Sequence, residues 1–111
     1  MKETTKAALG SWLTDELTRS DVRIQALTAD HRGDEAVFEK IRRNVLDIFR
    51  TILRTPGADF AGQLDRIPRS WEAALGKARE YGETEKAHIE SIKLEAAEWI
   101  RAQYAHLEDT V

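Results

Sequence analysis

Apolar residues recur every three or four positions through most of this chain, the spacing that one face of an α-helix requires. Between about Thr4 and His31 the recurring positions are Leu9, Leu13, Leu17, Ser20, Ile24 and Leu27. The clearest stripe comes next and comprises Val37, Phe38, Ile41, Val45, Ile48, Phe49 and Ile52. The pattern therefore predicts two helices, over residues 4–31 and 35–55.

The segments that flank the second stripe carry turn signals. Gly33 suits the left-handed position after a helix, and Asp34 suits the cap of the next one. Pro56 pushes Thr55 out of helical space, so the second helix should end there.

The second half of the chain predicts two further helices, over 68–81 and 84–108. Residues 56–67 read as one long connection, in which Phe60, Leu64 and Ile67 form a single helical turn, and Pro68 fits the first position of the third helix. The stripe fails near Gly82, which indicates a break there. It resumes in the last helix at Ile89, Ile92, Ala96, Trp99 and Leu107. The alternative is that the last two helices form one long kinked helix.

These elements predict an all-α fold: a small antiparallel bundle of four helices in a single domain, residues 1–111. A three-helix arrangement, whose long last helix pairs with a second copy, is the alternative. The chain contains no cysteine, no run of 18 apolar residues and no apolar segment near its polar N-terminus. We expect a cytoplasmic protein with no membrane attachment.

The charge of the chain is mixed and uneven. The net charge is −3, and residues 83–109 hold seven acidic and three basic residues. The polar face of the second helix carries a basic stripe, Lys40, Arg43, Arg50 and Arg54. Such a stripe permits binding of nucleic acid, but an acidic chain argues against it. Pairing with acidic residues of the last helix explains the same charges.

Two candidate sites of chemistry stand out, and neither has a complete motif. Glu85 and His88 form a Glu-x-x-His pair, which di-metal bundles use twice, together with two further glutamates. This chain has the pair once, so a metal or ligand site at Glu85 and His88 is an alternative hypothesis. No nucleophile, phosphate-loop or dinucleotide motif occurs. We expect no cofactor, and the sequence favours a non-enzymatic role.

Most of the aromatic residues lie on or beside the apolar stripes, and we expect them in the core. The preferred hypothesis is a helical interaction module that forms a homodimer or binds an unidentified protein. In this dimer Trp99, Tyr104 and Leu107 of the last helix supply apolar contacts. The basic residues Arg43, Arg50 and Arg54 then face acids of the other copy, such as Glu90, Glu95 or Glu98.

Overall fold

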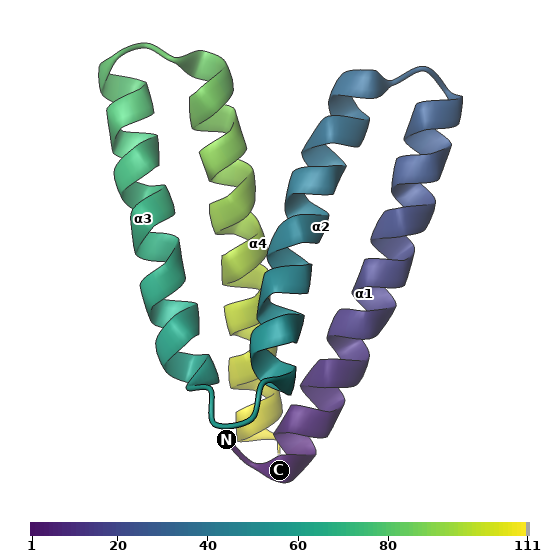
Figure 1. Ribbon diagram of the computed structural model, residues 1–111, viewed down its shortest axis with the longest axis vertical. Coiled ribbons are helices and arrows are strands. Elements are labelled where there is room, and N and C mark those ends of the chain that lie inside the picture. The colour runs from purple at the N-terminus through teal and green to yellow at the C-terminus, as the bar shows by residue number, and fades with distance from the viewer. Residues whose placement is uncertain (111) are drawn as a thin grey trace.

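The computed structural model describes residues 1–110 and contains four helices, so the prediction of an all-α, four-helix fold is confirmed. The helices are α1 (Glu3–Ala29), α2 (Gly33–Arg54), α3 (Phe60–Glu80) and α4 (Thr84–Asp109), and no strand occurs within the described part of the chain. Helices α1 and α2 form one antiparallel hairpin, and α3 and α4 form another. The two hairpins meet at one end and diverge into a V (Figure 1).

Helices α2 and α4 are the inner pair of this V. Each packs against its own hairpin partner and against the other inner helix, whereas the outer helices α1 and α3 do not touch each other in the described chain. The contact between the hairpins therefore runs mainly through α2 and α4.

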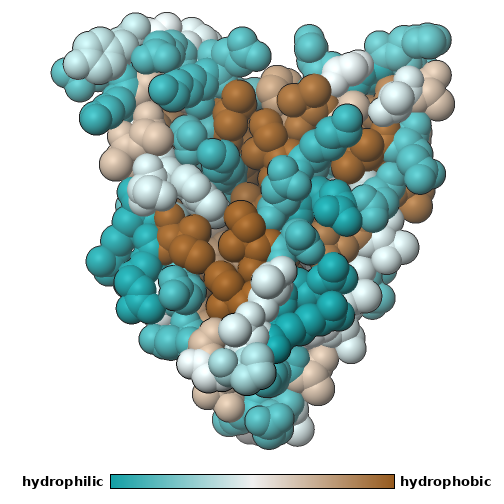
Figure 2. Space-filling view, viewed as in Figure 1, coloured by the Kyte–Doolittle hydropathy of each residue, from teal (hydrophilic) through white to brown (hydrophobic). Residues whose placement is uncertain are grey.

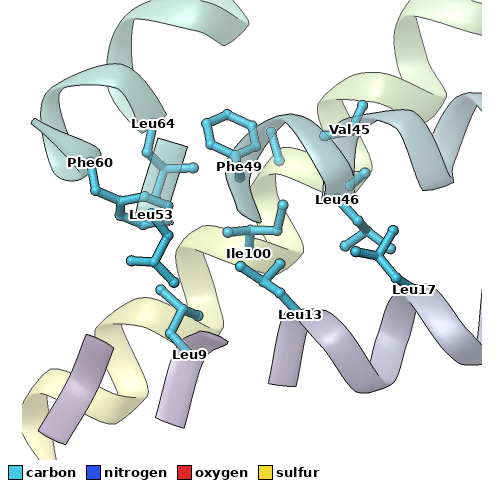
Figure 3. Close-up of a cluster of buried hydrophobic side chains, with 12 residues drawn as sticks. Leu9, Leu13, Leu17, Val45, Leu46, Phe49, Leu53, Phe60, Leu64 and Ile100 are labelled. Carbon is cyan, nitrogen blue, oxygen red and sulfur yellow. The ribbon is translucent and has the colours of Figure 1, made fainter. Parts of the chain in front are cut away.

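The hydrophobic core lies in the half of the molecule nearer the vertex of the V, where all four helices contribute side chains (Figure 3). Its buried members are Leu9, Leu13, Leu17, Val45, Leu46, Phe49, Leu53, Phe60, Leu64, Ala96, Ala97 and Ile100. Toward the open end, apolar side chains such as Leu27, Ile41 and Ile92 are only partly buried. Because the helices diverge there, the apolar stripe of a helix is buried near the vertex and only partly buried toward the open end.

The predicted start of the third helix at Pro68 is wrong, because α3 begins eight residues earlier, at Phe60. Asp59 caps this helix: its Oδ1 accepts a hydrogen bond from the backbone N–H of Gly62, 3.0 Å away. A Cβ atom at residue 62 would lie 2.1 Å from Oδ2 of Asp59. Glycine at this position therefore leaves room for the capping carboxylate.

Pro68 consequently lies inside α3 rather than at its first turn. A proline has no N–H, so the carbonyl of Leu64, one turn earlier, loses its partner within the helix. Arg101 of α4 supplies a replacement, because its Nη2 donates to the carbonyl oxygen of Leu64 at 3.1 Å. The proline is thus tolerated through a contact with the neighbouring helix.

The two hairpin turns both use a left-handed residue. The predicted break at Gly82 is confirmed: its φ is 67°, and the N–H of Glu83 donates to the carbonyl of Ala78 at 2.8 Å. In the first turn the prediction for Gly33 is wrong. His31 adopts the left-handed conformation instead, with φ of 58°, and Gly33 is already the first residue of α2. No side chain caps α2, so the capping role predicted for Asp34 is also wrong.

The two ends of the chain meet at the vertex of the V (Figure 1). Glu108 of α4 accepts a hydrogen bond from the Thr5 hydroxyl at 2.6 Å, and its backbone carbonyl accepts one from Lys2 Nζ at 2.9 Å. The hydrogen bond from Thr5 is the main reason why the pKa of Glu108 lies below its usual value. These contacts fasten the start of α1 to the end of α4.

Candidate interaction surface

Glu85 and His88 lie in the first turns of α4, at the open end of the V. The ring of His88 packs edge-on against Phe38 of α2, with centroids 4.6 Å apart and an interplanar angle of 90°. Among residues 1–110, no three or more His, Cys, Asp or Glu side chains are grouped so that they could hold a metal ion. The geometry therefore gives His88 an aromatic contact and lends no support to the metal hypothesis.

The basic residues of α2 point toward partners within the chain. Arg43 Nε donates to Asp21 of α1 at 2.5 Å, and Arg50 pairs with Asp47 of its own helix at 3.3 Å. Arg54 donates to the Thr14 hydroxyl at 3.4 Å. All three guanidinium groups therefore have a partner within the chain, whereas Lys40, the fourth residue of the stripe, is exposed and forms no ion pair within residues 1–110.

The three α4 residues expected at a dimer interface contact the core of their own chain. Trp99 packs edge-on against Trp12 of α1, with centroids 4.7 Å apart, and Arg42 lies 4.3 Å from the centre of its ring. The ring centroids of Tyr104 and Phe60 are 5.7 Å apart, and Leu107 also packs against the core. Each is only partly buried. Their role in a homodimer stays a prediction.

Of the acids expected to face a partner, Glu90 is buried and Glu95 is exposed. Glu90 pairs with Lys93 of the same helix, 3.2 Å away. Glu98 is exposed and pairs with Arg101 at 3.0 Å. Only Glu95 therefore combines an exposed position with the absence of an ion pair inside the described chain.

Two adjoining hollows lie over α2 where α1 and α4 diverge, and we call them together the α1–α4 groove. Its upper part encloses about 350 Å³ and its lower part about 310 Å³. The lining residues are Leu27 of α1, Glu35, Phe38, Glu39 and Arg42 of α2, and His88, Ile92, Glu95, Ala96 and Trp99 of α4. Apolar atoms supply most of its surface.

The groove exists because α1 and α4 are held together at only one end. The contact between Trp12 and Trp99 closes its lower end, and above it Leu27 and Ile92 remain partly exposed. On the face presented in Figure 2, apolar residues also reach the surface between the two hairpins. The hairpins therefore do not fully bury their facing apolar stripes.

The polar groups on the floor of the groove are well satisfied. Glu39 accepts hydrogen bonds from the Ser20 hydroxyl at 2.7 Å, from Arg23 at 3.0 Å and from Arg42 at 3.4 Å. Glu95, on the α4 side, forms no ion pair within residues 1–110. The floor is therefore fixed by internal contacts, whereas one wall carries an unpaired carboxylate.

Sequence reasoning placed Leu27 and Ile92 on core stripes and did not identify them as a surface. The one signal in the sequence is the mixed character of the α4 face that carries them. His88, Ile92, Glu95 and Trp99 follow one another at helical spacing, and two of the four are polar. A fully buried stripe would not place a glutamate between Ile92 and Trp99.

No helix in the described chain combines the length and the apolar character needed to cross a membrane. Comparison with known proteins gives no relative: no family model, no curated protein and no solved structure matches this chain.

Proposed function

We propose that this protein is a non-enzymatic helical interaction module that associates with a second copy of itself. The observation that carries the proposal is the α1–α4 groove, in which Leu27, Phe38 and Ile92 line an open hollow beside a closed core. Apolar surface that a folded chain leaves in a continuous hollow is a usual site of protein association. Burial of this surface against another chain would remove it from water.

A non-enzymatic role is supported by what the charged groups of the groove do. Arg23 and Arg42 both donate to the carboxylate of Glu39, and Arg42 also lies over the ring of Trp99. These contacts position the helices that line the groove. A binding surface needs such a fixed frame, since side chains that are already ordered lose little entropy on association.

The mass of the protein in solution tests the proposal. One chain has a mass of 12.6 kDa, so light scattering coupled to gel filtration should give twice this value at tens of micromolar chain. Ile92→Glu should lower the mass to that of one chain, because it places a charge in the groove. Val37→Glu is the matched control, since Val37 is 50% exposed and does not line the groove. A wild-type protein with the mass of a single chain contradicts the proposal.

A further inference from the structure

We infer that the distal segment of α3, residues 72–80, opens by local unfolding while the start of α3 and the other three helices stay folded. This segment belongs to one of the two outer helices of the V and leads to the turn at its open end (Figure 1). Three features of the second hairpin support this inference: the sparse contacts of the segment, a buried carboxylate opposite it and a glycine within it. Self-association is not required for the opening.

The two halves of α3 are anchored to different extents. The first half buries Phe60, Leu64 and Pro68, and the Leu64 carbonyl accepts a hydrogen bond from Arg101 of α4. In the distal segment only Ala78 is buried. No side chain of residues 72–80 forms a hydrogen bond or an ion pair within residues 1–110. Segments with few buried contacts open at a lower free energy than the core of a protein.

The corresponding half of the first hairpin is fastened by polar contacts between its helices. Glu39 of α2 accepts hydrogen bonds from the Ser20 hydroxyl at 2.7 Å and from Arg23 at 3.0 Å. Arg43 of α2 binds Asp21 of α1 at 2.5 Å. The second hairpin has no hydrogen bond or ion pair between side chains of α3 and α4 in its distal half, within the described part of the chain. Its distal half is therefore the less firmly held of the two.

A buried glutamate of α4 lies opposite the distal segment. The two helices are antiparallel, and Lys93 of α4 lies 5.9 Å from the centre of the Trp71 ring of α3. Glu90 comes about one turn before Lys93, so it lies about one turn beyond Trp71, at the height of residues 74–75. It shares one face of α4 with Arg101, about three turns later, which donates to the backbone of α3. Glu90 thus faces the distal segment.

The carboxylate of Glu90 is incompletely satisfied. Glu90 is 7% exposed, and its Oε1 accepts a hydrogen bond from Lys93 Nζ at 3.2 Å. Its buried Oε2 has no hydrogen-bond partner within residues 1–110. A buried acceptor without a donor destabilises the packed state, because it has lost its hydration without compensation. Separation of the distal segment from α4 returns this oxygen to water, so the carboxylate favours opening.

Gly76 lies in the middle of the distal segment, and packing does not require a glycine there. A Cβ atom at this position would meet no atom within 4 Å, and the φ of Gly76 is not positive. A glycine inside a helix is less stable than an alanine, because it loses more conformational freedom on folding. The glycine therefore weakens α3 in the same stretch in which side-chain contacts are fewest.

The residues that flank the segment define the extent of the opening. Pro68, one turn before it, has no N–H, so the helix lacks one of its own hydrogen bonds there. After it, Gly82 has a φ of 67° and belongs to the turn that leads to α4. When residues 72–80 unfold, they form a loop between two fixed points and uncover the side of α4 that carries Glu90. This side is distinct from the α1–α4 groove, which no residue of α3 lines.

Amide hydrogen exchange, followed residue by residue by NMR, tests the inference. We expect the amides of residues 72–80 to have protection factors lower by roughly tenfold or more than those around Phe49 in α2. Their exchange should also depend less on urea, because local unfolding exposes less surface than global unfolding. Equal protection with the same urea dependence would show that the segment opens only when the whole chain unfolds, and would overturn the inference.

Substitution of Glu90 tests the role of the buried carboxylate. Glu90→Met keeps a side chain of similar length and removes the charge, so exchange in residues 72–80 should slow by roughly tenfold. Glu72→Met is the matched control, since Glu72 lies in the same segment, is exposed and forms no ion pair within residues 1–110. It should change the exchange rates by less than about twofold. Equal effects of the two variants would overturn the inference.

Gly76→Ala provides a second variant that leaves the core untouched. Because alanine stabilises the helical form of the segment, exchange in residues 72–80 should slow by roughly threefold. Faster exchange in this variant would contradict the inference, since it would show that the glycine is needed by the folded segment.

A substitution in the first hairpin separates local from global opening. Leu17→Ala removes buried core contacts of α1, a helix that does not touch α3 in the described chain. The amides around Phe49 should exchange faster by roughly tenfold or more, because truncation of a buried Leu lowers global stability. The amides of residues 72–80 should change by less than about twofold, because their opening leaves the first hairpin intact. An equal acceleration of both groups of amides would overturn the inference.

Discussion

The two hairpins are built from helices of similar length, but they are held together by different polar contacts. In the first hairpin side-chain ion pairs join α1 to α2: Asp21 binds Arg43 at 2.5 Å, and Arg23 binds Glu39 at 3.0 Å. In the second hairpin no ion pair joins α3 to α4 within residues 1–110. Its polar link is the hydrogen bond from Arg101 to the carbonyl of Leu64, beside a cation–π contact of Lys93 with Trp71.

This difference shows that the contribution of a polar contact to stability depends on whether its groups would otherwise be hydrated or left without a hydrogen bond. An exposed ion pair replaces two hydrated charges and contributes about 0 to 1 kcal/mol. The Leu64 carbonyl has lost its helical partner to Pro68, and a backbone carbonyl left unsatisfied away from water costs about 1 to 3 kcal/mol. A single hydrogen bond in the second hairpin is therefore expected to matter more than an ion pair in the first.

Phe49→Ala should have the largest effect, because Phe49 is fully buried and contacts Phe60 of the other hairpin, with ring centroids 6.1 Å apart. Truncation of a buried Phe costs about 3 to 5 kcal/mol. The melting temperature should fall steeply, with both hairpins lost in one transition when thermal unfolding is followed by circular dichroism. Lys40→Ala, an exposed change in the same helix, should alter stability by no more than about 0.5 kcal/mol. Two separate transitions would show that the hairpins unfold independently.

Arg101→Met should have the next largest effect, a loss of about 1 to 3 kcal/mol, because it leaves the Leu64 carbonyl without its donor. The size of this loss should depend on Pro68. In a Pro68→Ala background the residue 68 N–H can bond the carbonyl within the helix, so removal of the Arg101 side chain should cost less. Urea unfolding of the wild type, both single variants and the double variant measures this coupling. Equal losses in the two backgrounds would refute the link between Pro68 and Arg101.

Asp21→Asn should have a smaller effect, about 0 to 1 kcal/mol, because the pair with Arg43 is partly exposed to solvent. The difference from wild type should shrink as salt rises from 0.05 to about 0.5 M, since salt screens exposed charges. The corresponding loss in Arg101→Met should change less with salt, because a carbonyl carries no net charge. If the salt dependence of the two variants is the same, the comparison between the hairpins fails.

Glu108→Gln should change the free energy of unfolding least of the four substitutions. The pH dependence of this change should appear only in acid. Hydrogen bonds from Thr5 and Tyr104 lower the pKa of Glu108 from the usual value of 4.5. A carboxyl with a lowered pKa stabilises the folded state above the unfolded pKa, and this contribution is lost as the pH falls through the folded pKa. Unfolding at a series of pH values should therefore show wild type approaching Glu108→Gln below pH 4.5. A stability gap that does not narrow in acid would contradict this assignment.

The pattern of the sequence was sufficient for the number and type of the helices but not for the start of α3. Phe60, Leu64 and Ile67 already follow helical spacing, and Asp59 is a good capping residue. The prediction stopped at Pro68 because a proline is unfavourable inside a helix. What makes it tolerable is Arg101, 33 positions along the chain, and no local pattern contains that contact.

The α1–α4 groove could not be predicted from the sequence for a related reason. Periodicity assigns Leu27 and Ile92 to the inner faces of α1 and α4, and the structure agrees. Whether two inner faces meet depends on the angle between the hairpins. The packing of Trp12 against Trp99 and of Phe49 against Phe60 accompanies the closed end of the V. Both pairs join different helices, so the hydrophobic spacing within one helix does not predict them.

Because the two ends of the described chain lie together at the vertex, the order of the helices along the chain can be changed by circular permutation. Lys2 Nζ donates to the backbone carbonyl of Glu108, so a short peptide linker could join residue 1 to residue 110 without crossing the groove. The exposed turn at residues 30–32 then offers a place to open the ring. A circular permutant cut there would begin with α2 and end with α1, with the same four helices in a new order. Fusion partners attached at the ends of the described chain, residues 1 and 110, would lie at the vertex, at the opposite end of the V from its open mouth.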